Sequence, residues 1–183
     1  MLEVNFTPFP LLTTERLLLR QLSTTDTARV FEMRTDPVAM KYLGKPLMQN
    51  ESEALALLGA IQHNLDNRNG ITWAMALKEA PDSLIGTIGY WKITKEHYRA
   101  EIGYMLMSRY FNKGYMTEAI IKTNEYAFSD MRLHSIEANI NPLNTASEAL
   151  LLKTGFVKEA HFRESFYNNG VFEDAAIYSL IKK

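Results

Sequence analysis

The chain has 183 residues, 46% of them hydrophobic, and a formal net charge of −1 at pH 7. This length and composition predict one domain with a sizeable core, spanning residues 1–183, and the near-neutral charge argues against a protein that coats nucleic acid. The chain has no cysteine, which excludes disulfides, thiolate zinc sites and a cysteine nucleophile and fits a cytoplasmic protein.

The N-terminal segment does not have the pattern of a signal peptide, because Glu3, Pro8 and Pro10 stand where an apolar core would run. Elsewhere, no stretch approaches the roughly 20 apolar residues of a membrane helix. We therefore expect neither a secretion signal nor a membrane span, and no membrane partner.

The first third of the chain predicts one strand followed by helices. Ser23 with Asp26 has the pattern of a capping box, and Asn50 with Glu53 has that of an N-cap and its N3 partner. The predicted elements are a strand over Glu15–Leu22 and helices over Thr24–Arg34, from Pro37, and near Glu51–Asp66.

The middle of the chain predicts an antiparallel meander. Three runs are rich in strand-forming residues: Ile71–Leu77, Leu84–Ile93 and Arg99–Met107. The connections at Ala80–Ser83 and Lys95–Tyr98 are short, and such turns join antiparallel neighbours.

The last third alternates helices and strands. Thr145 with Glu148 predicts a capping box, Gly155 a helix end, and Asn169-Gly170 a hairpin turn. The predicted elements are a helix ending near Asp130, a strand over Ser135–Ile140, a helix over Ala146–Thr154, and two final strands within residues 155–167 and 171–181. This order predicts an α/β fold: a mixed, mostly antiparallel sheet of about seven strands with helices on both faces.

The loop YFNKGYMTEA, Tyr110 to Ala119, lies between a predicted strand and a predicted helix. Gly114 has no Cβ, so the backbone can approach an anion closely, and Lys113 adds a positive charge. Backbone N–H groups at a helix start favour anions. The loop therefore predicts a phosphate-binding site.

Four stretches, TERLLLR, AEIGYML, FNKGYMTEA and NPLNTASEALLLKTGF, follow one another in an order and spacing that resemble a known family. The chain resembles, over nearly its whole length, the GNAT superfamily of acetyl-CoA-dependent N-acetyltransferases. It is most similar to the Rim-type branch, which acetylates the N-termini of ribosomal proteins. The resemblance implies that the fourth and fifth strands splay apart at a bulge and admit the pantetheine arm of acetyl-CoA.

The resemblance also implies which residues bind the coenzyme. The family's pyrophosphate loop carries Gln or Arg first and a small residue last, whereas this chain has Phe111 and Met116 there. Met116 either crowds the phosphates or points into the core. The implied coenzyme-binding residues are Leu106, Met107, Asn112, Lys113, Gly114, Tyr115, Met116, Thr117, Asn139 and Asn144.

Two residues are implied as catalytic. Glu101 lies where the family often has a carboxylate base, although it also fits an outward-facing glutamate in a salt bridge. Ser147 matches a serine that protonates the departing sulfur. The Rim-type glutamate before the last hairpin corresponds to Phe166, so the neighbouring Glu164 or a water molecule is an alternative base.

Tyr104 and Tyr110 are alternative acids in this reading. The resemblance implies acetyl transfer to a primary amine within a ternary complex, with acetyl-CoA as co-substrate. The first acceptor hypothesis is a protein N-terminal α-amine, and the second is a small amine such as a polyamine, an amino acid or an antibiotic. A non-catalytic acyl-CoA-binding protein is the alternative outside enzymes. The four histidines show no metal-ligand spacing, so we expect no metal. Aromatic residues near the last hairpin are compatible with a homodimer.

Overall fold

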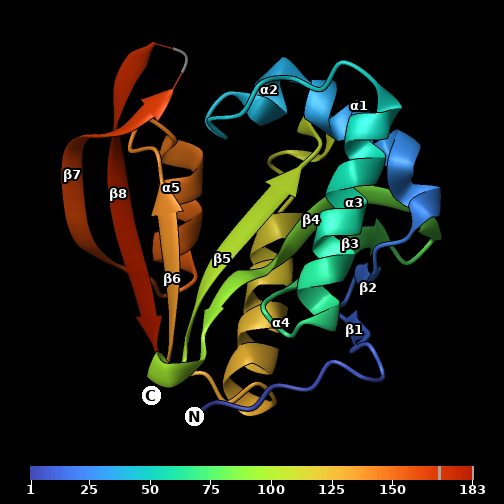
Figure 1. Cartoon of the computed structure of the whole chain (residues 1–183), viewed down its shortest axis with the longest axis horizontal. Helices are drawn as coiled ribbons and strands as arrows, with labels where there is room; N and C mark the ends of the chain where they lie inside the picture. Colours follow the sequence, from blue (N-terminus) through green and yellow to red (C-terminus); the bar gives the residue numbers. More distant parts are fainter. Residues whose placement is uncertain (169, 183) are drawn as a thin grey trace.

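An eight-stranded sheet organises the protein, with strand order β1-β2-β3-β4-β5-β6-β8-β7 (Figure 1). The computed structural model describes residues 1–168 and 170–182. The strands are β1 Leu12–Thr13, β2 Leu17–Gln21, β3 Ile71–Leu77, β4 Ala80–Thr94, β5 Arg99–Leu106, β6 Ser135–Ile140, β7 Val157–Asn168 and β8 Val171–Ile181. The α-helices are α1 Thr27–Thr35, α2 Pro37–Met40, α3 Glu51–Asp66, α4 Tyr115–Ser129 and α5 Thr145–Lys153.

The sheet is antiparallel except between β5 and β6, which are parallel. Their ladder spans only Arg99–Glu101 against Ser135–Glu137, and beyond it the two strands diverge (Figure 1). A register shift on β4 between Tyr90 and Lys92 lies opposite the end of this ladder. The predicted splay of the fourth and fifth strands is therefore confirmed, and the bulge lies on the neighbouring strand β4.

Helices cover both faces of the sheet, as predicted (Figure 1). On one face, α4 and α5 contribute residues such as Ile120 and Leu151 to a core that includes Ile102 and Leu106 of β5. On the other face, α1 and α3 pack with Met105 of β5 in a second core. Alternate residues of β5 therefore face opposite layers, as the pleat of a strand requires.

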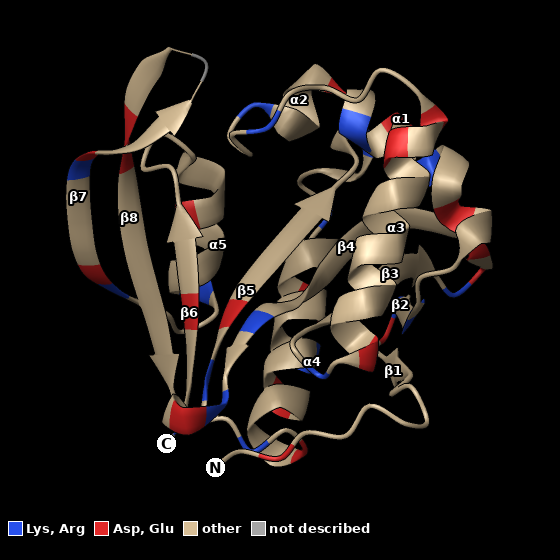
Figure 2. Ribbon diagram, in the orientation of Figure 1, with Lys and Arg blue, Asp and Glu red and all other residues tan. Residues whose placement is uncertain are grey.

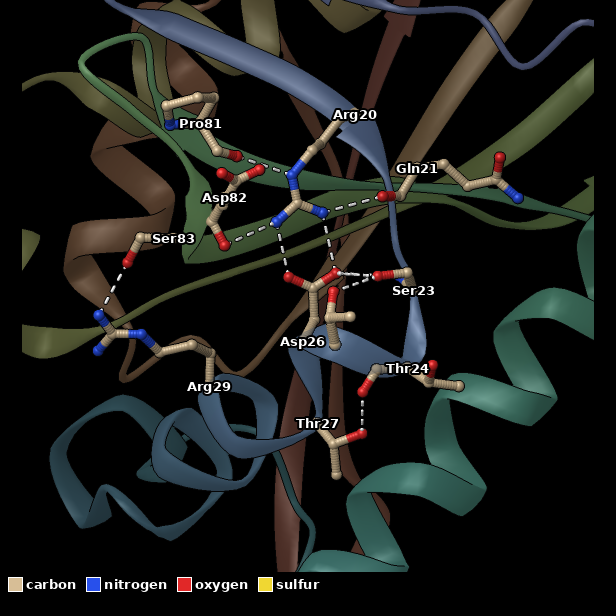
Figure 3. A network of polar contacts seen from close by, with 11 residues as sticks. Arg20, Gln21, Ser23, Thr24, Asp26, Thr27, Arg29, Pro81, Asp82 and Ser83 are labelled. Carbon is tan, nitrogen blue, oxygen red and sulfur yellow. Dashed lines mark hydrogen bonds and ion pairs between the residues drawn. The ribbon is translucent and has the colours of Figure 1, made fainter.

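The predicted turn at Ala80–Ser83 is wrong, because the chain turns at Lys78–Glu79 and β4 already begins at Ala80. The partners of Ala76 and Leu77 on β4 are Leu84 and Ala80, so residues 81–83 of β4 bulge out of the ladder. Arg20 holds this bulge by donating hydrogen bonds to the carbonyl oxygens of Pro81 and Asp82, at 2.8 and 3.3 Å (Figure 3). A proline, which has no N–H to donate, is tolerated at such a bulge.

Most predicted helix ends agree with the structure. The Ser23–Asp26 capping box and the Asn50 cap are confirmed, although Thr24–Asp26 forms a 3-10 turn before α1 begins. Gly155 follows α5 with φ +91°, as predicted for a helix C-terminus. The Thr145 cap is wrong, because Asn144 is the N-cap residue and accepts the Ser147 N–H.

Two further differences concern strands. The short strand β1 adds an eighth member to the predicted seven, and it pairs only through two residues. The predicted hairpin turn includes Asn169, which lies outside the described residues; the strands on either side pair in an antiparallel ladder that reaches Asn168 and Val171.

Candidate active site

A cavity of about 1310 Å³ occupies the gap between the diverging strands β5 and β6. Its walls come from β5, the loop before α4, the start of α5, α2 with the loop that follows it, and the β7–β8 hairpin. The cavity therefore joins segments from the first quarter, the middle and the end of the chain, and it reaches both faces of the sheet.

One wall is a free backbone edge on β5. The Met107 N–H donates to the Ile85 carbonyl oxygen at 2.9 Å, so the amide of Met107 points toward β4. Antiparallel ladders alternate, so Leu106 and Tyr104 direct their N–H and C=O groups away from β4. Because β6 pairs with β5 only as far as Glu101, these groups face the gap and can pair with an extended ligand.

The structure does not bring Met107 into this cavity. Its amide is engaged by Ile85, and its side chain, 2% exposed, belongs to the core beneath α1 and α3. Leu106, in contrast, lines the cavity. The two residues that the resemblance groups together therefore point in opposite directions, as neighbours on a strand must.

The loop before α4 presents its backbone to the cavity. Gly114 is the N-cap of α4 with φ +80°, a left-handed conformation that favours glycine, and Asn112 has φ +60°. The first intrahelical donor at this end is the Glu118 N–H, which reaches the Gly114 carbonyl oxygen at 3.1 Å. The preceding amides have no partner within the helix, and this suits an anion. The cavity wall includes Asn112, Gly114, Tyr115, Met116 and Thr117.

The side chains of Lys113 and Met116, two predicted coenzyme-binding residues, do not point toward the cavity as free ligands. The Lys113 side chain lies over the ring of Tyr110, 5.3 Å from its centre, and Lys113 is outside the cavity wall. Met116 is 8% exposed and packs into the core under α4. Of the two alternatives for Met116, the structure shows the core orientation.

Arg16 supports the loop before α4, although it was not among the residues predicted from the sequence. Its guanidinium donates to the Lys113 carbonyl oxygen at 3.0 Å, forms an ion pair with Glu118 at 2.8 Å, and lies 4.5 Å from the centre of the Tyr115 ring. The one feature of the sequence that could have indicated an ion pair here is Glu118, an acidic residue in the first turn of α4. Its partner comes from the start of β2, about a hundred residues away, and no local pattern connects them.

Ser147 and Tyr104 form one hydrogen-bonded pair at the start of α5. Their hydroxyl oxygens are 2.6 Å apart, and Ser147 is 7% exposed. Burial raises the pKa of Tyr104 to about 12, against the opposing effect of the Ser147 hydrogen bond, so its phenol is protonated at neutral pH. The structure thus brings together two residues that the sequence offered as alternative acids. Asn144 caps the same helix, and Asn139 lines the cavity from the facing strand β6.

Glu101 lies where the two strands begin to diverge. It is paired in register with Glu137 of β6, and acidic segments stand at the same level on both strands (Figure 2). Burial, and secondarily the charge of Glu137, raises the pKa of Glu101, with Lys92 and Arg99 opposing. Among the described residues, no side-chain ion pair involves Glu101. By strand alternation it projects to the α1–α3 side, whereas Tyr104 projects to the α4–α5 side.

The alternative base Glu164 lies outside the cavity wall. It has φ +50° within a register shift of β7 and is exposed, and its N–H donates to Asp174 at 2.9 Å. Phe166 does line the cavity, and its ring lies against Gly44, where a Cβ would be only 2.7 Å away. The hairpin therefore covers the α2–α3 loop with an aromatic ring.

Residues 1–168 and 170–182 contain neither a candidate metal site nor a candidate membrane-spanning helix. No group of three or more acidic or histidine side chains is arranged to hold a metal ion. No helix in the same part of the chain has the length and apolar content needed to span a bilayer.

Known proteins resemble this chain in sequence and in fold. Residues 16–157 match the family described as Acetyltransferase (GNAT) domain. The chain is 34% identical to the uncharacterized N-acetyltransferase YoaA of Bacillus subtilis over 174 residues, which cover 95% of this chain and 98% of the relative. It is 26% identical to the ribosomal protein uS5 alanine N-acetyltransferase of Escherichia coli, with 92% and 89% covered.

A solved GNAT acetyltransferase from Bacillus anthracis superimposes with a TM-score of 0.82 at 29% identity, with 94% of this chain and 98% of that chain covered. The family match spans well over half of the chain, and the sheet has the splayed parallel pair that the resemblance implies. The protein therefore belongs to the GNAT family of acetyltransferases.

Proposed function

We propose that this protein transfers the acetyl group of acetyl-CoA to the N-terminal α-amine of a protein, by direct attack within a ternary complex. The observation that carries the proposal is that one cavity has the free β5 edge and the α4 amides on one side and Glu101 on the other. The similarity to the Escherichia coli enzyme, whose name specifies an alanine of ribosomal protein uS5, supports a protein N-terminus as acceptor.

The residues present fit acetyl-CoA as the donor substrate. The unpaired amides at the start of α4 suit a pyrophosphate, and Gly114 keeps the loop open to it. Backbone groups of Tyr104 and Leu106 suit the amides of a pantetheine arm, which would add to β5 as a strand does. Asn139 and Asn144 offer further polar contacts along this path.

The reaction requires deprotonation of the acceptor amine, stabilisation of the oxyanion and protonation of the departing sulfur. Glu101, with its raised pKa, accepts a proton from the acceptor ammonium directly or through water. The amine nitrogen then bonds to the acetyl carbon, and a backbone N–H of the free β5 edge stabilises the oxyanion. As the carbon–sulfur bond breaks, the Tyr104–Ser147 pair donates a proton to the sulfur. The attacking nitrogen loses its second proton to water, and the pair regains a proton from water.

Calorimetric titration with acetyl-CoA tests the donor site. A Gly114→Trp variant should lose binding, because the side chain would fill the loop and the left-handed φ disfavours it. Gly59→Trp is the matched control, since a Cβ at this glycine of α3 meets no atom within 4 Å, and it should bind as the wild type does. No acetyl-CoA binding by the wild type would overturn the proposed function.

Thiol release from acetyl-CoA tests the acceptor. Peptides with a free α-amine should be acetylated, whereas N-terminally blocked peptides that carry a lysine should not. Initial-rate plots at several concentrations of both substrates should intersect, as direct attack requires. Turnover with blocked lysine peptides alone would show that the acceptor is a side chain.

A further inference from the structure

Arg34 lines the cavity from the last turn of α1, and its guanidinium has no partner among the residues that the structure describes. Its Nε is buried and has no hydrogen-bond acceptor among the described residues. It takes no part in any of the ion pairs formed in the described part of the chain. Arg29 on the same helix shows the contrast, because it pairs with Glu32 at 2.9 Å.

A guanidinium withdrawn from water without a counter-ion is costly. Burial lowers the pKa of Arg34, but an arginine side chain stays protonated in proteins. The charge therefore persists where its hydration is reduced. A carboxylate or phosphate that meets the planar Nε–Nη edge would compensate it with two parallel hydrogen bonds.

Two of the carboxylates of the cavity wall are engaged elsewhere. Glu173 accepts from the side-chain amides of Asn141 and Asn168, at 2.6 and 2.9 Å. Asp174 pairs with His161 at 2.7 Å. The remaining wall carboxylate, Glu101, is in none of the ion pairs formed by residues 1–168 and 170–182.

Asp36, two residues from Arg34 in the chain, is also occupied. It caps α2 by accepting from the Val38 and Ala39 amides, at 2.9 and 3.3 Å, and it accepts the Ser108 N–H at 3.3 Å. The other cationic side chains of the cavity wall are all exposed, and they are Lys41, Lys45 and Lys153. Arg34 differs from them because it is partly withdrawn from solvent.

The position of Arg34 places it in the acceptor half of the cavity. Its helix packs on the β5 face that carries Met105, which is the face to which Glu101 projects. The α4 loop and the Tyr104–Ser147 pair belong to the opposite face. An anion held by Arg34 would therefore belong to the amine substrate and not to the coenzyme.

We infer that Arg34 is an anion subsite for the acceptor: the amine substrate carries a carboxylate or phosphate, which Arg34 binds while the amine faces Glu101. This inference rests on the proposed acetyltransferase function. For a protein N-terminus, the anionic group is the side chain of an acidic or phosphorylated residue close behind the terminal amine. A purely cationic acceptor such as a polyamine is disfavoured, because it would leave Arg34 uncompensated and repelled.

Matched peptides test the inference. Three peptides with the same free N-terminal residue carry glutamate, glutamine or phosphoserine at the second position, and a second set carries them at the third. In at least one set we expect kcat/KM for the glutamate or phosphoserine peptide to exceed that for the glutamine peptide by roughly tenfold or more, as for a charge-assisted hydrogen bond. Comparison of the two anionic peptides separates a carboxylate site from a phosphate site.

Variants then assign the preference to Arg34. Arg34→Gln should abolish the preference for anionic peptides, Arg34→Lys should keep part of it, and both should bind acetyl-CoA as the wild type does in calorimetry. Arg29→Gln is the matched control, since it removes one arginine charge from the same helix outside the cavity wall, and it should keep the preference. Thermal melting checks that each variant is folded.

Three outcomes would overturn the inference. They are failure of the wild type to prefer an anionic peptide in either set, an unchanged preference in Arg34→Gln, and weakened acetyl-CoA binding in Arg34→Gln with acceptor selectivity intact. A small-amine pair, lysine against cadaverine, separates this inference from the proposed function. Turnover of lysine but of no peptide would reject the protein acceptor and keep the subsite, whereas preference for cadaverine would reject the subsite.

Discussion

At the residue scale, the site depends on neighbours that lie far apart in the chain. Glu101 and Glu137 become adjacent only because β5 and β6 are parallel over three residues. Ser147 and Tyr104 meet because α5 starts beside the free edge of β5. Sequence patterns could nominate Glu101, Ser147 and Tyr104 one by one, but they could not show which of them share a hydrogen bond or a charge.

Glu101→Gln should lower kcat/KM by about 100-fold or more and remove the low-pH inflection of its pH profile. The reason is that the raised pKa of Glu101 brings proton acceptance closer to neutral pH. Glu137→Gln is the control: loss of its negative charge should lower the pKa of Glu101 and shift the inflection to lower pH. An unchanged profile in Glu101→Gln would assign the base role to water.

The same pKa shift has a consequence for stability. The folded state binds the Glu101 proton more tightly than the unfolded state, so this residue's contribution falls as pH rises from its ordinary pKa through the raised one. Urea unfolding at pH 7 should therefore show Glu101→Gln to be at least as stable as the wild type.

Tyr104→Phe and Ser147→Ala should both lower kcat, and the double variant should be only slightly slower than the slower single variant. Residues that act as one unit are not additive in their effects. Their 2.6 Å contact predicts such coupling. Multiplicative effects in single-turnover experiments would show instead that the two hydroxyl groups act independently.

At the element scale, local signals placed most helices and strands but did not show what holds them together. Periodicity and caps predicted α3 and β6 with the observed bounds. They misplaced the turn before β4, because the Arg20–Asp26 pair holds residues 80–83 in a bulge that no local pattern indicates. Asn144 rather than Thr145 caps α5, since either residue type can cap a helix and the chain path decides between them.

Arg16→Gln should raise the dissociation constant of acetyl-CoA about tenfold, with little change in the KM of the amine. The variant removes the hydrogen bond to Lys113 and the ion pair with Glu118, which together hold the loop in position. Lys122→Gln, on the exposed side of α4, should bind normally. A rise in the amine KM instead would contradict a role in positioning the coenzyme loop.

Asp26→Asn should destabilise the protein by about 3 kcal/mol or more, because it leaves the Arg20 charge without its buried partner. Asp26 is 1% exposed and binds Arg20 through both carboxylate oxygens, at 2.9 and 2.7 Å (Figure 3). Urea unfolding measures the change. Glu125→Gln, which breaks an exposed pair with Lys122, should cost less than about 1 kcal/mol.

At the scale of the whole molecule, the cavity exists because the sheet is held together at one end and opens at the other. The three-residue ladder between β5 and β6 is the parallel contact that joins the two parts of the sheet. A ligand seated in the gap would contact both parts, and it would add contacts that the ladder does not provide. The single domain, the cytoplasmic location and the homodimer stay predictions of the sequence.

Acetyl-CoA at about 100 times its dissociation constant should raise the melting temperature by roughly 5–10 °C. Such an excess adds about 2.7 kcal/mol to stability, and a chain of this size gains about 2–4 °C per kcal/mol. Differential scanning calorimetry measures the shift. Gly114→Trp should show none, and a shift of equal size in this variant would place the ligand elsewhere.

The sequence by itself determined the order of most elements and the family, because these depend on local periodicity, glycine positions and ordered motifs. The phosphate-binding role of the loop before α4 stays a prediction. Only the tertiary structure decided that Arg16 supports the loop, that Glu164 lies outside the cavity wall, and that Arg34 has no partner within the described part of the chain. The physical reason is that a contact depends on where the chain path brings two side chains, and on the register of their strands. A one-residue shift such as that between Lys158 and Ala160 of β7 turns the side chains that follow to the other face, and no local pattern records it.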